Sequence, residues 1–235
     1  MRRMRHLKPR EIQGCKLALD ASIPSSLYDA TSGGGLVAAN GDVARWEDQS
    51  GNGYHVTQST AGMRAVRKVG VRAGLDALQF PGGANRMINS SISVSLPFTL
   101  FSFGQTSETT SVSIDSYNSI QSPIYRGGGA DNPGLFVYAN NGAVAITDDS
   151  EWGGLLAIAT SANGKSIRRG RATATTATSA TNSLSGVSVG DIRGNPSVVV
   201  GGYNWDGYLS EIAVFSVALN NHVSQRLNDS RSRKW

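Results

Sequence analysis

Carboxylates are the side chains of this sequence that could cleave a polysaccharide, because glycoside hydrolases place two of them across one sugar. Carboxylates on one face of a strand would fall on alternate residues, as in Glu-x-Asp-x-Glu, and neither this run nor Glu-x-Asp-x-x-Glu occurs. The densest acidic group, Asp148, Asp149 and Glu151, precedes Trp152-Gly153-Gly154 and is typical of a solvated turn. The carboxylates therefore predict no catalytic site.

Nucleophilic and zinc chemistry depends on histidine and cysteine, and the chain has only three His and one Cys. A Ser/His/Asp triad would have to use His55 or His222, and His222 falls in an expected C-terminal helix. The histidines and Cys15 lack the spacing of a zinc site. These residues predict that the protein is not an enzyme.

The polar turn after Trp46 carries oxygen-bearing side chains. Asp48 and Asn52, with loop carbonyls, could supply some of the oxygen ligands that calcium prefers. In the alternative interpretation these side chains only brace the turn, because Asp and Asn readily bond the nearby backbone. Gly51 and Gly53 are expected to take positive φ angles. We expect no cofactor, with calcium at Asp48 and Asn52 as the alternative.

Exposed aromatic side chains could hold a sugar by stacking against it. The candidates are Tyr54, Tyr203 and Trp205, and Tyr138 is a further one. The alternative is that each of these rings packs in the core or against a loop.

The elements that must position these residues are strands. The composition, with 28 Gly and 17% charged residues in 235, suits many short strands joined by tight turns. Alternation and apolar runs predict strands at residues 16–20, 43–46, 54–58, 77–80, 98–103, 135–138, 143–146, 155–159, 166–171, 197–201 and 209–215. Residues 172–188, rich in Thr, Ala and Ser, are expected to form an extended excursion or an intermolecular contact.

The last strand and the helix after it carry two specific predictions. The apolar positions Leu209, Ile212 and Val214 change phase across Ser210-Glu211, which indicates a β-bulge that turns Glu211 inward or towards a neighbouring loop. Asn220 or Asn221 can then cap a short C-terminal helix with Val223 and Leu227 on one apolar stripe.

Three segments resemble the laminin-G-like branch of the concanavalin A-like lectin-glucanase superfamily, of the kind found in phage structural proteins. They are residues 17–22 (LALDAS), residues 43–58 (VARWEDQSGNGYHVTQ) and residues 77–83 (ALQFPGG), together with the ending at residues 207–220 (GYLSEIAVFSVALN). The resemblance implies an all-β fold, a two-sheet antiparallel jelly-roll sandwich with a short C-terminal helix. It also implies a tendency to bind surfaces or glycans.

This fold places large apolar side chains between the two sheets. The predicted core consists of Leu19, Trp46, Phe80, Phe98, Leu100 and Phe215. The expected organisation is a basic N-terminal arm at 1–15 followed by a single sandwich domain at 16–235.

The formal net charge of +5 is concentrated at the two ends of the chain. Arg2, Arg3, Arg5, Lys8 and Arg10 lie in the first ten residues. Ordering a short polar arm costs backbone entropy that its own contacts cannot recover, so these residues are predicted to bind a partner. The sandwich offers no groove for nucleic acid, which makes a protein partner the better interpretation.

Residues 1–16 lack the apolar region of a signal peptide, and no run of about 18 apolar residues suggests a membrane span. We therefore expect a non-enzymatic virion structural protein, made in a host cytoplasm and forming homo-oligomers or lattice contacts. It would be a capsid decoration, head-fibre or tail-associated protein, docked on other virion proteins such as the major capsid protein, with cell-surface polysaccharide as a further partner. A free-standing carbohydrate-binding module is the alternative, and a polysaccharide-cleaving enzyme is the third hypothesis.

Overall fold

The structure is a computed structural model of the 235-residue chain. It describes residues 7–106, 111–117, 124–127, 134–138, 143–147, 152–160, 164–169, 172–176, 183–191 and 204–234. Nearly all regular structure in these ranges is antiparallel β, as the sequence predicts.

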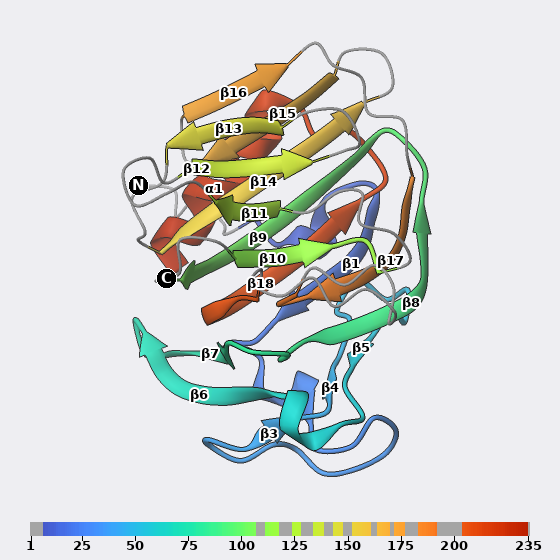
Figure 1. Ribbon diagram of the computed structural model, residues 1–235, viewed down its shortest axis with the longest axis vertical. Coiled ribbons are helices and arrows are strands. Elements are labelled where there is room, and N and C mark those ends of the chain that lie inside the picture. The colour runs from blue at the N-terminus through green and yellow to red at the C-terminus, as the bar shows by residue number, and fades with distance from the viewer. Residues whose placement is uncertain are drawn as a thin grey trace.

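Two nine-stranded sheets pack face to face and form a sandwich (Figure 1). The first, called the β9 sheet, has the order β16 (Ala172–Thr176), β15 (Gly164–Arg169), β14 (Gly153–Thr160), β9 (Phe98–Thr106), β18 (Asp206–Phe215), β7 (Leu75–Pro81), β6 (Ala65–Arg72) and β3 (Asp42–Val43), with β1 (Cys15–Asp20) also paired to β18. The second, called the β10 sheet, has the order β13 (Ala143–Thr147), β12 (Gly134–Tyr138), β11 (Ile124–Gly127), β10 (Ser111–Asp115), β17 (Leu184–Val189), β8 (Met87–Val94), β5 (Val56–Thr57), β4 (Arg45–Trp46) and β2 (Leu27–Tyr28).

One α-helix, α1 (Asn221–Lys234), covers the outer face of the β9 sheet, and in Figure 1 it lies behind the strands. The Asn220 side chain accepts a hydrogen bond from the Val223 N–H at 3.0 Å, which is the predicted N-cap. Three short 3₁₀ turns complete the described helical structure: η1 (Pro9–Glu11), η2 (Pro24–Ser26) and η3 (Ala61–Met63). Among the described residues, no helix has the length and apolar character needed to cross a membrane.

The core between the sheets contains five of the six predicted residues: Leu19, Trp46, Phe80, Phe98 and Leu100. Phe215, the sixth, is also fully buried, but it packs on the outer face of the β9 sheet beneath α1. The β9 sheet buries apolar side chains on both of its faces. On strand β9, Phe98 and Leu100 face the inner core, while Phe101 and Phe103 face the helix side, as Phe215 does. A strand covered on both faces has a nearly continuous apolar sequence rather than an alternating one.

The polar turn after Trp46 has the predicted backbone. Gly51 has φ of 89° and Gly53 has φ of 76°. Both angles lie in the left-handed region that favours glycine. A Cβ atom added at either position would meet no other atom within 4 Å, so backbone strain is the only barrier to a larger side chain.

Replacing Gly53 with Val is therefore expected to lower the free energy of unfolding by about 1–3 kcal/mol, the usual cost of a strained backbone conformation. The measurement is chemical denaturation of the variant against the parent protein. Gly62→Val is the matched control, since Gly62 also faces open space but lacks a positive φ. An equal loss of stability in both variants would contradict the strain explanation.

The Thr/Ala/Ser-rich segment differs from its prediction. Instead of an excursion, Ala172–Thr176 forms β16 at the edge of the β9 sheet. Leu184–Val189 forms β17 between β8 and β10. Thr and Val are good strand formers, and pairing with a neighbouring strand outweighs the low sequence complexity. The strand predicted at 197–201 lies outside the described residues.

The first described residues pack against the domain itself. The Leu7 N–H donates to Ser230 Oγ at 3.0 Å, Pro9 is buried, and Ile12 joins the apolar cluster under α1. This part of the predicted arm therefore packs on its own domain, and binding of Lys8 and Arg10 to a protein partner stays a prediction. Arg2, Arg3 and Arg5 lie outside the described residues, and their binding to a partner stays a prediction.

Candidate functional site

The β-bulge predicted in the last strand is present and decides where Glu211 lies. The pairing of β18 with β9 changes register between Leu209 and Glu211. Without the extra residue, Glu211 would share the inner face with Leu209, because side chains alternate along a strand. The bulge instead places Glu211 on the outer face with Ala213 and Phe215. A carboxylate is thereby moved from the apolar core to the side covered by α1.

Asp20 lies directly opposite Glu211 on the neighbouring strand β1. Lys234, at the end of α1, joins the two carboxylates: its Nζ atom lies 2.8 Å from Asp20 Oδ2 and 2.7 Å from Glu211 Oε1. The Arg231 side chain forms an ion pair with the other oxygen of Glu211. These four residues, called the clasp, connect the helix to β1 and β18.

Two members of the clasp are removed from water. Glu211 is fully buried, and Arg231 is 2% exposed. Burial raises the pKa of Glu211 above the ordinary 4.5, and the nearby Asp20 acts in the same direction, while Arg231 and Lys234 oppose the increase. The site therefore contains two different carboxyl groups. Glu211 is buried and has a raised pKa, and Asp20 is partly exposed to solvent.

A cavity of about 240 Å³ opens beside the clasp. Its wall combines the clasp with the N-terminal segment and the β1–η2 connection: Lys8, Pro9, Arg10, Ala18, Leu19, Asp20, Ser22, Ile23, Gln49, Glu211, Arg231 and Lys234. Lys8 and Arg10 are exposed at its rim. The cavity thus has a charged floor, a cationic rim and several apolar side chains.

A second group of side chains lies further along β18 on the same face. Tyr208 pairs with Gln79 on β7 and with Gln105 on β9. Because Gly153 pairs with Gly104, Trp152 comes next to Gln105 at the start of β14. These four half-buried residues, Gln79, Gln105, Trp152 and Tyr208, form a row across four strands that we call the outer strip.

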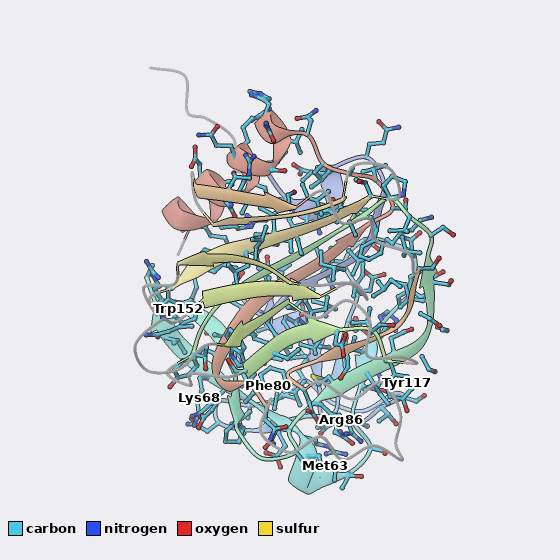
Figure 2. All side chains as sticks on the ribbon, turned by 45° about the horizontal axis from the view of Figure 1, so that its top comes forward. Met63, Lys68, Phe80, Arg86, Tyr117 and Trp152 are labelled. Carbon is cyan, nitrogen blue, oxygen red and sulfur yellow. The ribbon has the colours of Figure 1, made fainter. Side chains whose placement is uncertain are left out.

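The two aromatic rings of the outer strip hold each other in place. The ring centroids of Trp152 and Tyr208 are 6.0 Å apart with an interplanar angle of 18°. Phe103 packs against Trp152 from the apolar cluster, at 6.1 Å, and the Arg72 guanidinium lies 5.6 Å from the Trp152 ring. Figure 2 shows Trp152 towards the same edge of the molecule as Lys68 and on the other side from Tyr117. The result is a rigid, partly exposed aromatic surface flanked by amide groups.

The predicted calcium residues brace the turn through hydrogen bonds. The Asp48 carboxylate accepts bonds from the backbone N–H groups of Ala18, Ser50 and Tyr54, at 2.8–3.1 Å. The Asn52 amide donates to two carbonyl groups of β1, at 3.1 Å each. Both contacts tie the turn to the first strand, as the alternative interpretation expects. Calcium binding stays an untested prediction.

The predicted stacking residues are not brought together. Trp205 is 4% exposed and belongs to the core between the sheets, so its ring is not available to a sugar. Tyr54 is half-buried and packs against the same core. Tyr203 and the acidic group Asp148, Asp149 and Glu151 lie outside the described residues. The described stacking surface comes instead from Trp152 and Tyr208.

Two further patterns do not form a nucleophilic site. The segment from Gly186 to Gly190 fits the Gly-x-Ser-x-Gly pattern of hydrolases, but its Ser188 is fully buried within β17 rather than on a strand-to-helix turn. His55 accepts a hydrogen bond from the Asp48 backbone N–H at 3.0 Å through Nδ1, so it supports the polar turn.

Sequence inspection missed most members of the clasp and of the outer strip. Glu211 was indicated by the change of phase in the last strand. Arg231 and Lys234 are three residues apart, which places them on one side of a helix, and this spacing was the available signal. Asp20 carries no local signal, because its partner at Glu211 is distant in the sequence.

No protein-family model matches the sequence, and no curated protein matches it. A mutant GH54 α-L-arabinofuranosidase soaked with 4-nitrophenyl α-L-arabinofuranoside is similar with a TM-score of 0.70 and 14% identity, over 95% of this chain and 64% of that one. An arabinofuranosidase complexed with arabinofuranosyl-α-1,2-xylobiose gives a TM-score of 0.65 and 16% identity, with the same coverages of 95% and 64%.

The binding domain of botulinum neurotoxin DC in complex with SialylT has a TM-score of 0.55 and 11% identity, over 92% of this chain and 51% of that one. The chain thus spans less than two thirds of each of these three structures. Identities this low show a common fold. The predicted two-sheet antiparallel sandwich with a short C-terminal helix is confirmed.

Two expectations from the sequence are wrong by this comparison. The chain was expected to be a virion structural protein, whereas the structures that share its fold are two glycosidases and a toxin binding domain. The expectation that it is not an enzyme relied on the lack of a carboxylate pair along one strand. The structure pairs Asp20 and Glu211 across two strands, which a search along one strand cannot find.

Proposed function

We propose that this chain is a carbohydrate-binding β-sandwich domain that holds a polysaccharide on the outer strip. The observation that carries the proposal is the row of two partly exposed aromatic rings and two glutamine amides across neighbouring strands. The next outward-facing residue of β9, Phe103, is apolar and fully buried, so the partly exposed rings are confined to this row on that side.

The chemistry of the strip suits a sugar. The C–H face of a sugar ring is apolar and can pack on Trp152 or Tyr208, while its hydroxyl groups need donors and acceptors. Each Gln amide supplies both kinds of group, and Arg72 adds a cation beside the Trp152 ring. The strip is built on paired strands, so little ordering is needed when a ligand binds.

The fold supports the same proposal. One similar structure is a toxin binding domain in complex with SialylT, and another is an arabinofuranosidase complexed with arabinofuranosyl-α-1,2-xylobiose. Proteins that bind sugars thus share the β-sandwich fold of this chain.

The test is a binding screen of the full chain against arabinan, arabinoxylan, xylan, cellulose and polygalacturonate. Replacing Trp152 and Tyr208 with Ala is expected to weaken binding of the preferred polymer at least about tenfold, as for a central aromatic of an interface. Tyr117→Ala is the matched control, because Tyr117 is also half-buried and lies on the other side of the molecule (Figure 2). Melting temperatures establish that each variant is folded.

Two results would contradict the proposal. In one, the chain binds none of these polymers. In the other, it binds a polymer as tightly after both strip residues are replaced as before.

A second candidate function is cleavage of a glycosidic bond at the clasp, and one observation favours it. Retaining glycosidases hold two carboxyl groups about 5–5.5 Å apart. Lys234 Nζ lies 2.8 Å from Asp20 Oδ2 and 2.7 Å from Glu211 Oε1. These two oxygens therefore cannot be further apart than about the spacing found in retaining glycosidases. The raised pKa of Glu211 suits a proton donor, and Asp20 is the partly exposed partner.

Release of reducing sugar from the same polymers measures this activity. If the clasp is catalytic, Glu211→Gln abolishes the release, while the strip variants lower it through weaker binding. Activity that survives Glu211→Gln in the folded protein excludes the clasp as the catalytic pair.

A further inference from the structure

We propose that the cavity beside the clasp receives the carboxylate of an acidic sugar, so that the polysaccharide bound by this chain is a polyuronate. The inference rests on the proposed carbohydrate-binding function and names the class of its ligand.

The charges that line the cavity favour an anion. Four cations face it, Lys8, Arg10, Arg231 and Lys234, against two carboxylates, Asp20 and Glu211. Lys234 is shared between both carboxylates, and Arg231 is paired with Glu211. The carboxylates are therefore already neutralised within the clasp.

The two rim cations are left for a ligand. Lys8 and Arg10 have no ion pair with any residue that the structure describes. Glu11 is on the same 3₁₀ turn, and its carboxylate accepts the backbone N–H of Lys8, at 3.4 Å. The two cations lie on a segment anchored by buried Pro9, so their backbone is already in place. An arginine and a lysine at one rim can together bind a carboxylate through charge-assisted hydrogen bonds.

The other properties of the cavity suit a single sugar ring. Its volume of about 240 Å³ is below the roughly 300–1,000 Å³ of pockets for drug-sized ligands. Ser22 and Gln49 add polar groups to the wall, and Pro9 and Ile23 add apolar ones. A uronate ring has hydroxyl groups, apolar C–H groups and one carboxylate, which correspond to these three kinds of lining.

The position and the overall charge agree with a polymeric acid. Tyr208 of the outer strip and Glu211 of the clasp are three residues apart on β18, or about 10 Å at the usual rise of a strand. One polysaccharide chain can therefore reach both places. The whole sequence has 22 Lys and Arg against 17 Asp and Glu, and this excess attracts a polyanion.

A nucleic acid is the competing polyanion. Apart from Arg72, the outer strip presents amide groups and aromatic rings rather than cations, which suits the hydroxyl groups and C–H faces of a sugar better than a line of phosphates. The sugar is therefore the better match, and nucleic acid becomes an outcome of the test.

The test compares polygalacturonate with highly methyl-esterified polygalacturonate, which has the same backbone without most of the charge. The full chain is expected to bind the acid form at least about tenfold more tightly at physiological ionic strength. Lys8→Met and Arg10→Met together are expected to remove this preference and leave binding to the esterified polymer unchanged. Arg226→Met is the control, because Arg226 is an exposed cation of α1 outside the cavity.

The outcomes separate the inference from the function on which it rests. Equal affinity for both polymers, or a preference that survives the double variant, overturns the inference and leaves carbohydrate binding intact. If the chain binds neither form of polygalacturonate and no neutral polysaccharide of the screen, both the inference and the proposed carbohydrate binding are overturned. Single-stranded DNA is the polyanion control. If it binds as tightly as polygalacturonate and the double variant loses this binding, the cavity is a general polyanion site and the sugar assignment is overturned.

Discussion

Replacing Trp46 with Ala is expected to lower the free energy of unfolding by about 3–5 kcal/mol, the range for large aromatic residues in a core. Trp46 is fully buried between the sheets and pairs with Leu27 and Val56 on its two neighbouring strands. Its loss leaves a cavity that these strands cannot close by themselves. Denaturation by guanidinium chloride measures the effect.

Trp46→Phe is the matched control for this prediction. The Trp46 indole nitrogen has no hydrogen-bond partner among the described residues. Phenylalanine keeps much of the apolar volume and removes that unsatisfied donor, so the control should lose clearly less stability than the alanine variant. Similar stabilities of the parent protein and of the alanine variant would show that Trp46 does not fill the core.

Replacing Arg231 with Met is expected to cost about 3–5 kcal/mol at neutral pH, because the change leaves the fully buried Glu211 without one of its two cations. Thermal or chemical denaturation measures the loss. The double variant Glu211→Gln with Arg231→Met removes both charges of this pair and should be more stable than the single variant. If the two are equally destabilised, the Arg231 contribution comes from packing rather than from charge.

The stability of the clasp also depends on pH, with a sign that follows from Glu211. Burial raises its pKa in the folded protein, so between pH 4.5 and the raised pKa the folded state holds a proton that the unfolded chain has released. The stabilisation from this group is complete below the ordinary value of 4.5 and is lost as the pH rises through the raised pKa. Glu211→Gln should flatten the decline with pH, because glutamine does not titrate.

The sequence is sufficient to predict residues whose role depends on their own strand. Trp46 and Phe80 are large apolar residues in extended runs, and the structure buries both completely. The phase change at Ser210-Glu211 is likewise visible in the sequence and marks the bulge. In each case the pattern of neighbouring residues contains the physical cause, which is the two-residue period of a strand.

The clasp and the outer strip depend on distant pairing, which no local pattern contains. Lys234 bonds Asp20 across 214 residues, and that contact requires β1 beside β18 and α1 folded back over both. The strip likewise takes one residue from each of four strand regions. Trp205 shows the converse error, since it was a candidate for an exposed stacking ring, while its backbone N–H donates to the Gly190 carbonyl and its ring lies in the core.

Binding of sugars on the outer strip is tested most directly by nuclear magnetic resonance of the ¹⁵N-labelled chain. Titration with oligosaccharides of arabinan and of polygalacturonate should shift the indole N–H signal of Trp152 and the side-chain amides of Gln79 and Gln105. The buried indoles of Trp46 and Trp205 are internal controls that should stay in place. Binding that shifts signals around Arg86 and Asp191 while those of Trp152 and both glutamines stay fixed would contradict the claim.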